Sequence, residues 1–233
     1  MSEKKRIIFL TGAGVSAESG LATFRDSGGL WEGYDINEVA SIEGFSRNPE
    51  LVLDFYNLRR KQAYSAKPNS AHIAIAALEE YFEVTVITQN VDDLHERAGS
   101  TDVVHLHGEL GKVRSVLNDS TVEIWGNKDL NLGDVGFDGA QLRPHIVWFG
   151  EMVPMLEKAI EIMPRADILV VVGTSLQVYP AASLIHYVNS STDKYIIDPS
   201  NTELKSDKKW IHFKERATIG MEKLTKDLIT NYV

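Results

Sequence analysis

The chain has 233 residues, a formal net charge of −9 and no cysteine. Its length and its 43% hydrophobic content suit one medium α/β domain that buries most of its apolar surface. The acidic balance argues against a nucleic-acid partner, which normally needs a basic face, and fits a basic peptide better. Without cysteine the chain can form no disulfide, thiolate zinc site, iron–sulfur cluster or cysteine nucleophile.

The beginning of the chain reads as part of the folded domain. Its first apolar run, 7–10, follows the basic segment 4–6 and leads directly into a glycine loop. This pattern predicts a buried strand rather than a signal peptide. No stretch reaches the ~18 to 20 apolar residues that span a bilayer, so we expect a cytoplasmic protein without a membrane partner.

Three nearly continuous apolar runs predict buried strands of a parallel sheet. These runs are 6–11, 84–88 and 167–173. Helical patterns follow in chain order at 49–67, from the N-cap at Asn69-Ser70 to about Phe82, and at about 154–163, 180–189 and 218–232. The alternation of strands and helices predicts an α/β fold, a Rossmann-like doubly wound parallel sheet.

Two stretches depart from this alternation. Residues 21–46 are rich in glycine and polar side chains, which predicts a long loop with short helices. Residues 111–143 carry two short β-like pieces, 112–117 and 121–125, between turn signals, which predicts a small inserted module. We therefore expect one domain over 1–233. Its Rossmann-like part would span about 1–30, 84–110 and 144–233, and its small module about 31–83 and 111–143.

The segment 12–17, with the sequence GAGVSA, follows the first predicted strand and matches the dinucleotide pattern G-x-G-x-x-[GA]. Glycines in this pattern let the backbone approach a pyrophosphate at a helix N-terminus. A tight turn without any ligand would give the same pattern, so the motif alone is weak evidence. A dehydrogenase would place a second strand and an acidic residue about twenty residues further on. Residues 23–32 predict no strand, which disfavours hydride transfer.

Six blocks occur in the order and spacing of the sirtuins: 12–21, 23–25, 89–92, 105–108, 144–151 and 173–175. The chain therefore resembles the sirtuin family over most of its length. The resemblance implies a Rossmann-like NAD domain with a smaller module, and NAD⁺ and an acyl-lysine that meet in the cleft between them.

The resemblance also implies which residues bind NAD⁺. The loop from Gly12 to Trp31 would wrap the phosphates and ribose, and 89–92 would line the nicotinamide and ribose pocket. The implied cofactor-binding residues are Gly12, Ala13, Gly14, Ser16, Ala17, Glu18, Thr23, Phe24, Arg25, Trp31, Gln89, Asn90, Val91, Asp92, Gly173, Thr174, Ser175, Ile196, Ile197, Asp198 and Ala217. On its residues alone, 89–92 is also good turn and N-cap chemistry. Ile196 departs from the family, which often has an asparagine there.

His107 is the catalytic candidate. With His105 it forms a two-residue alternation that would put both rings on one strand face, so a metal-binding pair is one interpretation. A satisfied structural histidine is another, and a general base a third, because an unperturbed pKa of ~6.5 suits proton transfer near neutral pH. The resemblance implies the general base. The acyl oxygen would attack C1′ of the nicotinamide ribose, nicotinamide would leave, and His107 would draw a proton from a ribose hydroxyl.

Peptide binding is expected to use the backbone. Residues 147–150 resemble the family's strand-like loop, and the stretch around Val178 supplies the facing one, so an acyl-lysine peptide could add between them as a strand. The implied substrate residues are Val147, Phe149, Gly150 and Val178. Trp148 and Phe149 could instead be core aromatics, and for Phe149 both interpretations can hold.

Tyr56 and Arg59 stand at i and i+3 of a predicted helix and share one face. A hydroxyl beside a guanidinium is a good receptor for a carboxylate. The sirtuin branch that removes succinyl and malonyl groups carries this Tyr-x-x-Arg with a small residue in the pocket, for which Ala40 is the candidate. A surface arginine beside a half-buried tyrosine is the alternative. Deacetylation is expected beside the acidic acyl groups.

The chain departs from most sirtuins in its small module, where four cysteines usually hold a structural zinc. Ser115 stands at the first expected position, and no thiol follows, so we expect no zinc. The module would then depend on its own apolar packing. The residues expected to provide this packing are Val113, Val116, Leu117, Val122, Ile124, Trp125, Leu130, Leu132, Val135 and Phe137.

Two other functions remain open at the level of sequence. The first is an NAD⁺ glycohydrolase or ADP-ribosyltransferase, which would consume the cofactor without an acyl-lysine. The second is a non-catalytic NAD-sensing module. Nicotinamide release with and without an acyl-peptide separates the first from a deacylase, and turnover of a His107 variant addresses the second.

Overall fold

A computed structural model describes residues 4–22, 30–31, 33–200 and 209–233. They contain a six-stranded parallel sheet with the strand order β11-β10-β9-β1-β4-β5. Its strands are β1 (Arg6–Thr11), β4 (Glu83–Thr88), β5 (Val103–His105), β9 (Ile168–Val172), β10 (Asp193–Ile197) and β11 (Trp210–Phe213). If the six strands of this sheet are renumbered in chain order, their arrangement is that of a doubly wound fold. The direction of winding reverses between β1 and β9. The predicted fold class is confirmed.

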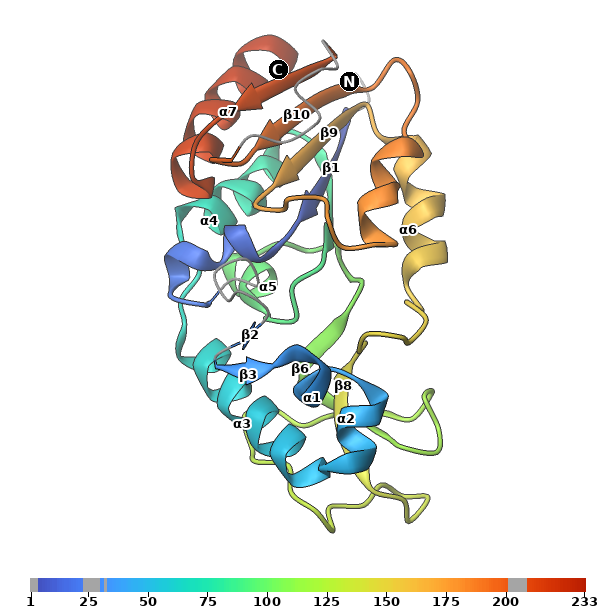
Figure 1. Ribbon diagram of the computed structural model, residues 1–233. Helices are drawn as coiled ribbons and strands as arrows, with labels where there is room; N and C mark the ends of the chain where they lie inside the picture. The colour runs from blue at the N-terminus through green and yellow to red at the C-terminus, as the bar shows by residue number, and fades with distance from the viewer. Residues whose placement is uncertain (1–3, 23–29, 32, 201–208) are drawn as a thin grey trace.

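Helices cover both faces of this sheet (Figure 1). On one face lie α4 (Ser70–Ala77) and α7 (Ala217–Tyr232), which pack on Ile7 and Phe9. On the other lie α6 (Leu156–Ile162) and the 3₁₀ helix η6 (Ala181–His186), which pack on Ile8 and Leu10. Because both faces are buried, the central strands are nearly continuously apolar, and this is why the sequence predicted them. No helix of the described ranges is long and apolar enough to cross a membrane.

The second part of the molecule lies below the parallel sheet in Figure 1. It contains α1 (Ile36–Val39), α2 (Ile42–Arg47) and α3 (Pro49–Ser65), together with β2 (Leu30–Trp31) and β3 (Tyr34–Asp35). A three-stranded antiparallel sheet with the order β7-β6-β8 completes it, built from β6 (Gly108–Ser115), β7 (Val122–Ile124) and β8 (Leu142–Ile146). A short helix, α5 (Leu94–Ala98), follows β4. The short helices α1 and α2 bear out the short helices predicted within 21–46, whereas most of the predicted loop, 23–29 and 32, lies outside the described residues.

One predicted helix has a different form. The segment 180–189 forms only the 3₁₀ helix η6, and the Tyr187 amide bonds the carbonyl three residues earlier, at Leu184. The Ser183 hydroxyl donates to the carbonyl of Pro180 at 2.7 Å, which competes with a regular α-helical ladder. The predicted helix is therefore present, but as a 3₁₀ helix that ends at His186.

The expected apolar core of the small module was also wrong. Seven of the ten predicted core residues are between 40% and 86% exposed: Val116, Leu117, Val122, Ile124, Leu132, Val135 and Phe137. Val113 and Leu130 are fully buried, but against Leu53 of α3 and Leu142 of β8. A thin three-stranded sheet with long loops has only one covered face, so most of its apolar residues have nothing to pack against.

Polar side chains of α3 hold the module instead. Arg60 is fully buried and donates from Nε to the carbonyl of Leu110 at 2.8 Å and from Nη1 to that of Lys128 at 3.2 Å. Asn57 donates to the Leu130 carbonyl at 3.0 Å and accepts the Leu130 amide at 2.8 Å. At the first expected cysteine position, the Ser115 hydroxyl donates to Asp138 at 2.6 Å.

Candidate functional site

Four of the predicted motifs follow strands of the parallel sheet. The glycine loop, with the 3₁₀ helices η1 (Ala13–Val15) and η2 (Ala17–Ser19), follows β1, and 173–175 follow β9. Residues 89–92 follow β4, and His107 follows β5. Because the strands are parallel, all four motifs lie at the carboxyl ends of the strands, which form one edge of the sheet. The point where the winding of the sheet reverses, between β1 and β9, lies at this edge.

The loops after β1 and β9 touch through their backbones. The Gly12 amide donates to the Val172 carbonyl at 3.0 Å, and the Gly14 amide donates to the Gly173 carbonyl at 2.8 Å. A Cβ on Gly14 would lie 2.7 Å from the Cα of Gly173, and Gly173 has a φ of 63°. The contact between the two loops therefore requires glycine before any ligand is considered.

A buried polar network connects the glycine loop to the loop after β4. The Ser16 hydroxyl accepts from Asn90 Nδ2 and donates to Asp92 Oδ2, both at 3.1 Å. His72 Nε2 lies 3.4 Å from the same hydroxyl, and its Nδ1 accepts the Asn69 amide at 3.3 Å. Burial lowers the pKa of His72 to about 4 and raises the pKa of Asp92. The ring is therefore neutral, with its proton on Nε2 facing Ser16.

A second buried set lies beside this network. The Thr11 hydroxyl donates to that of Thr88 at 2.8 Å and lies 3.1 Å from His95 Nε2. The rings of His72 and His95 are in edge contact with centroids 4.9 Å apart, and burial lowers the pKa of His95 to about 3. Sequence reasoning missed both histidines, since each acts on a residue 56 or more positions away.

His105, the last residue of β5, and His107, just after β5, contact successive carbonyls of the loop that follows β4. His107 Nδ1 lies 3.0 Å from the Gln89 carbonyl, and His105 Nδ1 lies 3.0 Å from the Asn90 carbonyl. β5 ends at His105, and Gly108, with a φ of 83°, already begins β6, so the two rings do not share one strand as predicted. His105 Nε2 also bonds Glu96 at 2.6 Å, a partner that the sequence did not reveal.

The ring of His107 has a defined tautomer. A carbonyl can only accept, so Nδ1 carries the proton and Nε2 is the free base. Burial lowers the pKa of His107, although the Gln89 carbonyl acts in the opposite direction. His107 is therefore neutral near pH 7 and can accept a proton at Nε2.

The predicted substrate residues connect to this edge through the backbone. The Val147 amide donates to the carbonyl of His107 at 3.0 Å, and the Phe149 amide donates to that of Ala40 at 2.9 Å. Trp148 Nε1 donates to the Tyr56 hydroxyl at 3.0 Å. Thus the segment 147–149 joins the catalytic candidate to the α1 end and to α3.

Charged side chains surround this segment. Glu151 accepts from both ends of the Arg143 guanidinium at 2.7 and 3.0 Å and from Arg114 at 3.0 Å. Its Oε2 also accepts the Trp148 amide at 2.7 Å. Arg59 is buried on the same helix as Tyr56. Sequence reasoning singled out Arg59 but missed the cluster of Arg143, Arg114 and Glu151.

The remaining predicted residues are placed less directly. Thr23, Phe24 and Arg25 lie outside the described residues, as does the side chain of Trp31. The side chains of Ile196, Ile197 and Ala217 belong to the apolar cores beside the sheet, so only their backbone could reach a ligand. Asp198 is buried at the carboxyl end of β10, and Val178 precedes η6. Glu18 accepts the amide and hydroxyl of Thr218, at the start of α7.

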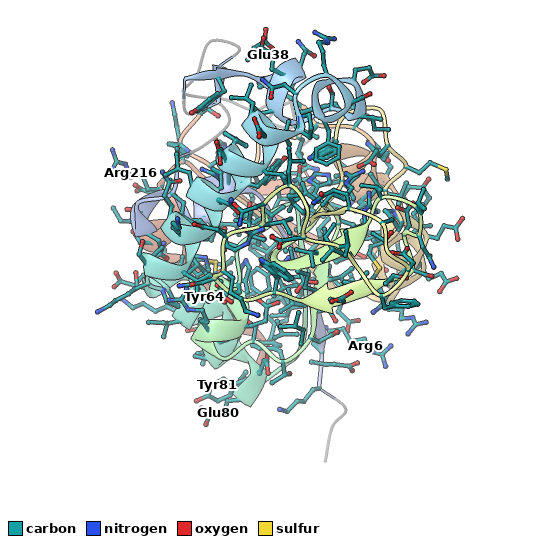
Figure 2. The ribbon with its side chains drawn as sticks, turned by 90° about the horizontal axis from the view of Figure 1, so that it is seen from below. Arg6, Glu38, Tyr64, Glu80, Tyr81 and Arg216 are labelled. Atoms are coloured by element: carbon teal, nitrogen blue, oxygen red, sulfur yellow. The ribbon has the colours of Figure 1, made fainter. Side chains whose placement is uncertain are left out.

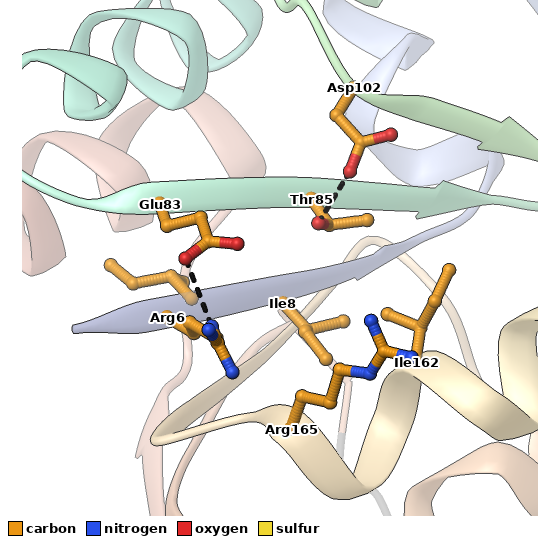
Figure 3. A pocket seen from close by; sticks show the side chains of 8 residues that line it. Arg6, Ile8, Glu83, Thr85, Asp102, Ile162 and Arg165 are labelled. Atoms are coloured by element: carbon orange, nitrogen blue, oxygen red, sulfur yellow. Dashed lines mark hydrogen bonds and ion pairs between the residues drawn. The ribbon is translucent and has the colours of Figure 1, made fainter. Parts of the chain in front are cut away.

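A cavity of about 110 Å³ lies at the opposite end of the parallel sheet. Figure 3 shows it between the first residues of the paired strands β1 and β4 on one side and Ile162 and Arg165 on the other, with the Arg6–Glu83 ion pair among its lining residues. In Figure 2, Arg6 lies across the molecule from Glu38 of α1. The carboxyl ends of the strands are remote from this cavity, so it is not the candidate site. Within the described ranges, no group of three or more His, Asp or Glu side chains could hold a metal ion.

Comparison with known proteins agrees with this arrangement. The Sir2 family model matches residues 12–180. The chain is 54% identical over 227 residues to an NAD-dependent protein deacylase of Helicobacter pylori strain J99, covering 97% of this chain and 96% of the relative. A Bacteroides thetaiotaomicron protein of the same name is 50% identical over 230 residues, with 97% and 98% covered.

Two solved structures share the fold. A Sir2 homolog in complex with NAD is 40% identical, has a TM-score of 0.88 and is matched over 99% of this chain and 92% of its own. Sir2Tm bound to a propionylated peptide is 31% identical, with a TM-score of 0.79 and coverage of 97% and 94%. The sirtuin resemblance is confirmed, and the chain belongs to the Sir2 family.

Proposed function

We propose that this chain removes succinyl and malonyl groups from lysine side chains of proteins, with deacetylation beside them, and consumes NAD⁺ in doing so. The general part of this function, an NAD-dependent protein deacylase, is the activity named for relatives at 50% and 54% identity across 97% of the chain. The choice of acyl group is the finer part, and the geometry around Tyr56 supports it.

The edge formed by the carboxyl ends of the parallel strands suits NAD⁺ because of the hydrogen-bonding side chains that lie there. Hydroxyl and amide side chains gather there, with Gln89 Nε2 donating to the Thr174 hydroxyl at 3.2 Å beside Ser16 and Asn90. Such neutral groups match ribose hydroxyls and a carboxamide. NAD⁺ supplies the ribose carbon that receives the acyl oxygen, and nicotinamide is the leaving group.

His107 would act as the general base. Its Nε2 is unprotonated near neutral pH because burial lowers the pKa of the ring, and the Gln89 carbonyl fixes Nδ1 as the protonated nitrogen. A base of this kind accepts a ribose hydroxyl proton at Nε2. The backbone bond from Val147 to the His107 carbonyl places this base beside the segment that would receive the peptide.

The observation that carries the acyl preference is a fully buried tyrosine on which the charges of two arginines and of Glu151 act. Tyr56 is 1% exposed, and the positive charges of Arg59 and Arg143 both act on its hydroxyl. Ala40, whose side chain is a single methyl group, belongs to the same buried cluster. A carboxylate in this pocket would meet a neutral hydroxyl donor and guanidinium groups, which are the groups that bind it best.

The test compares kcat/KM for acetyl, succinyl and malonyl versions of one peptide in wild type and in Arg59→Met. Loss of a charge-assisted hydrogen bond should lower the succinyl-to-acetyl ratio about 10- to 100-fold. Lys61→Met, an exposed change on the same helix, is the matched control and should leave the ratio within about twofold. An unchanged ratio in Arg59→Met would contradict the pocket, and fast nicotinamide release without peptide would favour a glycohydrolase.

A further inference from the structure

We propose that Trp148 is a positioning residue for acyl selectivity, because its indole N–H turns the Tyr56 hydroxyl proton toward the acyl group. The inference rests on the proposed function, since it concerns the same pocket. It goes further by assigning a role to a side chain that would itself touch neither NAD⁺ nor the reacting atoms.

The direction of one hydrogen bond carries the argument. Trp148 Nε1 lies 3.0 Å from the Tyr56 oxygen, and the two side chains are 2% and 1% exposed. An indole nitrogen can only donate, so the phenol oxygen accepts this bond and its own proton must point elsewhere. Burial raises the pKa of Tyr56, which keeps that proton in place.

The indole is held from two sides. The centre of the Arg143 guanidinium lies 3.4 Å from the centroid of the Trp148 ring, and the Phe45 ring packs against it with centroids 5.2 Å apart. The Glu151 carboxylate accepts a hydrogen bond from the Trp148 amide at 2.7 Å and binds Arg143 with both oxygens. Since the backbone and the ring are both fixed, the indole N–H keeps its direction before substrate arrives.

Different acyl groups should respond differently to this fixed donor. A succinyl or malonyl group ends in a carboxylate that accepts a hydrogen bond from Tyr56, whereas an acetyl group ends in a methyl group that accepts none. A hydroxyl that is already oriented loses no rotational freedom when the carboxylate binds. Trp148 would thus favour the acidic groups without contacting them.

The test measures kcat/KM for succinyl and acetyl versions of one peptide in Trp148→Phe, Tyr56→Phe and the double variant. Trp148→Phe should lower the succinyl-to-acetyl ratio about 3- to 10-fold, which is the range of one neutral hydrogen bond. If Trp148 acts through the hydroxyl, it should change the ratio by less than about twofold when Tyr56 is already phenylalanine. A purely structural role would lower both substrates together and keep the ratio, and that result overturns the inference.

A second measurement works without a folded Trp148 variant. In wild type the Trp148 indole proton should exchange with solvent slowly, and Tyr56→Phe should speed this exchange at least about tenfold if the bond to the hydroxyl protects it. Equal exchange in the two proteins overturns the inference.

The outcomes also separate this inference from the proposed function. If Arg59→Met collapses the succinyl-to-acetyl ratio while Trp148→Phe does not, the acidic pocket stands and the role of Trp148 falls. If Arg59→Met and Tyr56→Phe both leave the ratio unchanged, the acyl preference itself is wrong, and the role of Trp148 falls with it.

Discussion

The carboxyl-end edge of the parallel sheet and the part built around α3 both bury polar side chains, but of different kinds. The edge buries histidines whose pKa is lowered by burial, His72, His95 and His107, so they stay neutral. The part around α3 buries four arginines, Arg59, Arg60, Arg114 and Arg143, each less than a tenth exposed. A histidine can release its charge when buried, whereas an arginine cannot.

This difference matches the chemistry proposed for each region. The nicotinamide ring of NAD⁺ is positively charged, and neutral histidines do not repel it. A succinyl or malonyl group is negatively charged. Glu151 pairs with Arg143 and Arg114, and Asp119 also pairs with Arg114. Arg59 supplies a further buried guanidinium group that would attract an acidic acyl group. In a protein with a net charge of −9, the proposed acyl pocket would thus gather several of the positively charged side chains.

The largest effect on activity should come from a change in the neutral histidines at the carboxyl-end edge of the sheet. His107→Ala removes the proposed base and should lower kcat about 10²- to 10⁴-fold. NAD⁺ affinity, measured by calorimetry, should fall by no more than about tenfold, because the variant loses at most one neutral hydrogen bond to a ribose hydroxyl. Unaltered turnover would remove His107 from the mechanism.

On the charged side, Arg60→Met should lower the free energy of unfolding by about 3 kcal/mol, measured by urea denaturation. The change leaves the buried Leu110 carbonyl and the part-buried Lys128 carbonyl without their donor, and a buried unpaired group costs about 1 to 3 kcal/mol. Lys61→Met is the matched control: it breaks an exposed ion pair with Asp129, which should cost less than about 1 kcal/mol. Equal losses would show that Arg60 does not hold the module.

These two side chains also mark how far the sequence could lead. His107 was identified because it stands in a block of family motifs, and the central strands because burial on both faces makes them nearly continuously apolar. Arg60 could not be identified, since on α3 it looks like its neighbours Arg59 and Lys61. What separates the three is the surface that each one meets, and 50 residues lie between Arg60 and its Leu110 partner.

The short strands and the module core escaped prediction for similar reasons. β10 begins with Asp193 and Lys194, which are less buried than the rest of the strand and break the apolar run. In the module, residues such as Ile124 and Phe137 have the composition of a core but are 86% and 83% exposed. Hydrophobicity says that a side chain favours burial, but only the arrangement of neighbouring segments decides whether it is buried.

The pH dependence of catalysis tests whether His107 is neutral, as the comparison of the two regions requires. Because burial lowers the pKa of His107, its unprotonated form should persist below pH 6.5. The acid limb of kcat/KM, which reports the free enzyme, should therefore fall with a midpoint below the ordinary histidine value of ~6.5. A midpoint above that value would mean that the ring is stabilised as a cation, as arginines are on the other side.

His105 is the exception on the neutral side, and a smaller effect tests it. Burial alone would lower its pKa, but the hydrogen bond and charge of Glu96 raise it, so the ion pair stabilises the fold while His105 is protonated. This stabilisation is fully present below the unfolded histidine pKa of ~6.5 and is lost as pH rises through the raised folded value. Glu96→Gln should therefore cost about 1 kcal/mol at pH 6, a figure reduced for the 40% exposure of Glu96, and less at pH 9. A cost that does not depend on pH would mean a neutral His105.

The smallest effect concerns the link between the glycine loop and α7. Arg216, the N-cap residue of α7, makes no side-chain capping bond, and the carboxylate of Glu18 takes that place by accepting the Thr218 amide at 3.1 Å and its hydroxyl at 3.0 Å. Glu18→Gln keeps one acceptor but loses the charge near the helix N-terminus, which should cost about 0.5 kcal/mol in urea unfolding. The exposed change Glu222→Gln, one turn into α7 and away from the loop, is the control. If Glu18 acts only as a cap, NAD⁺ affinity should fall no further than this stability loss explains. A larger fall in affinity, with Glu222→Gln unaffected, would instead place Glu18 in contact with the cofactor.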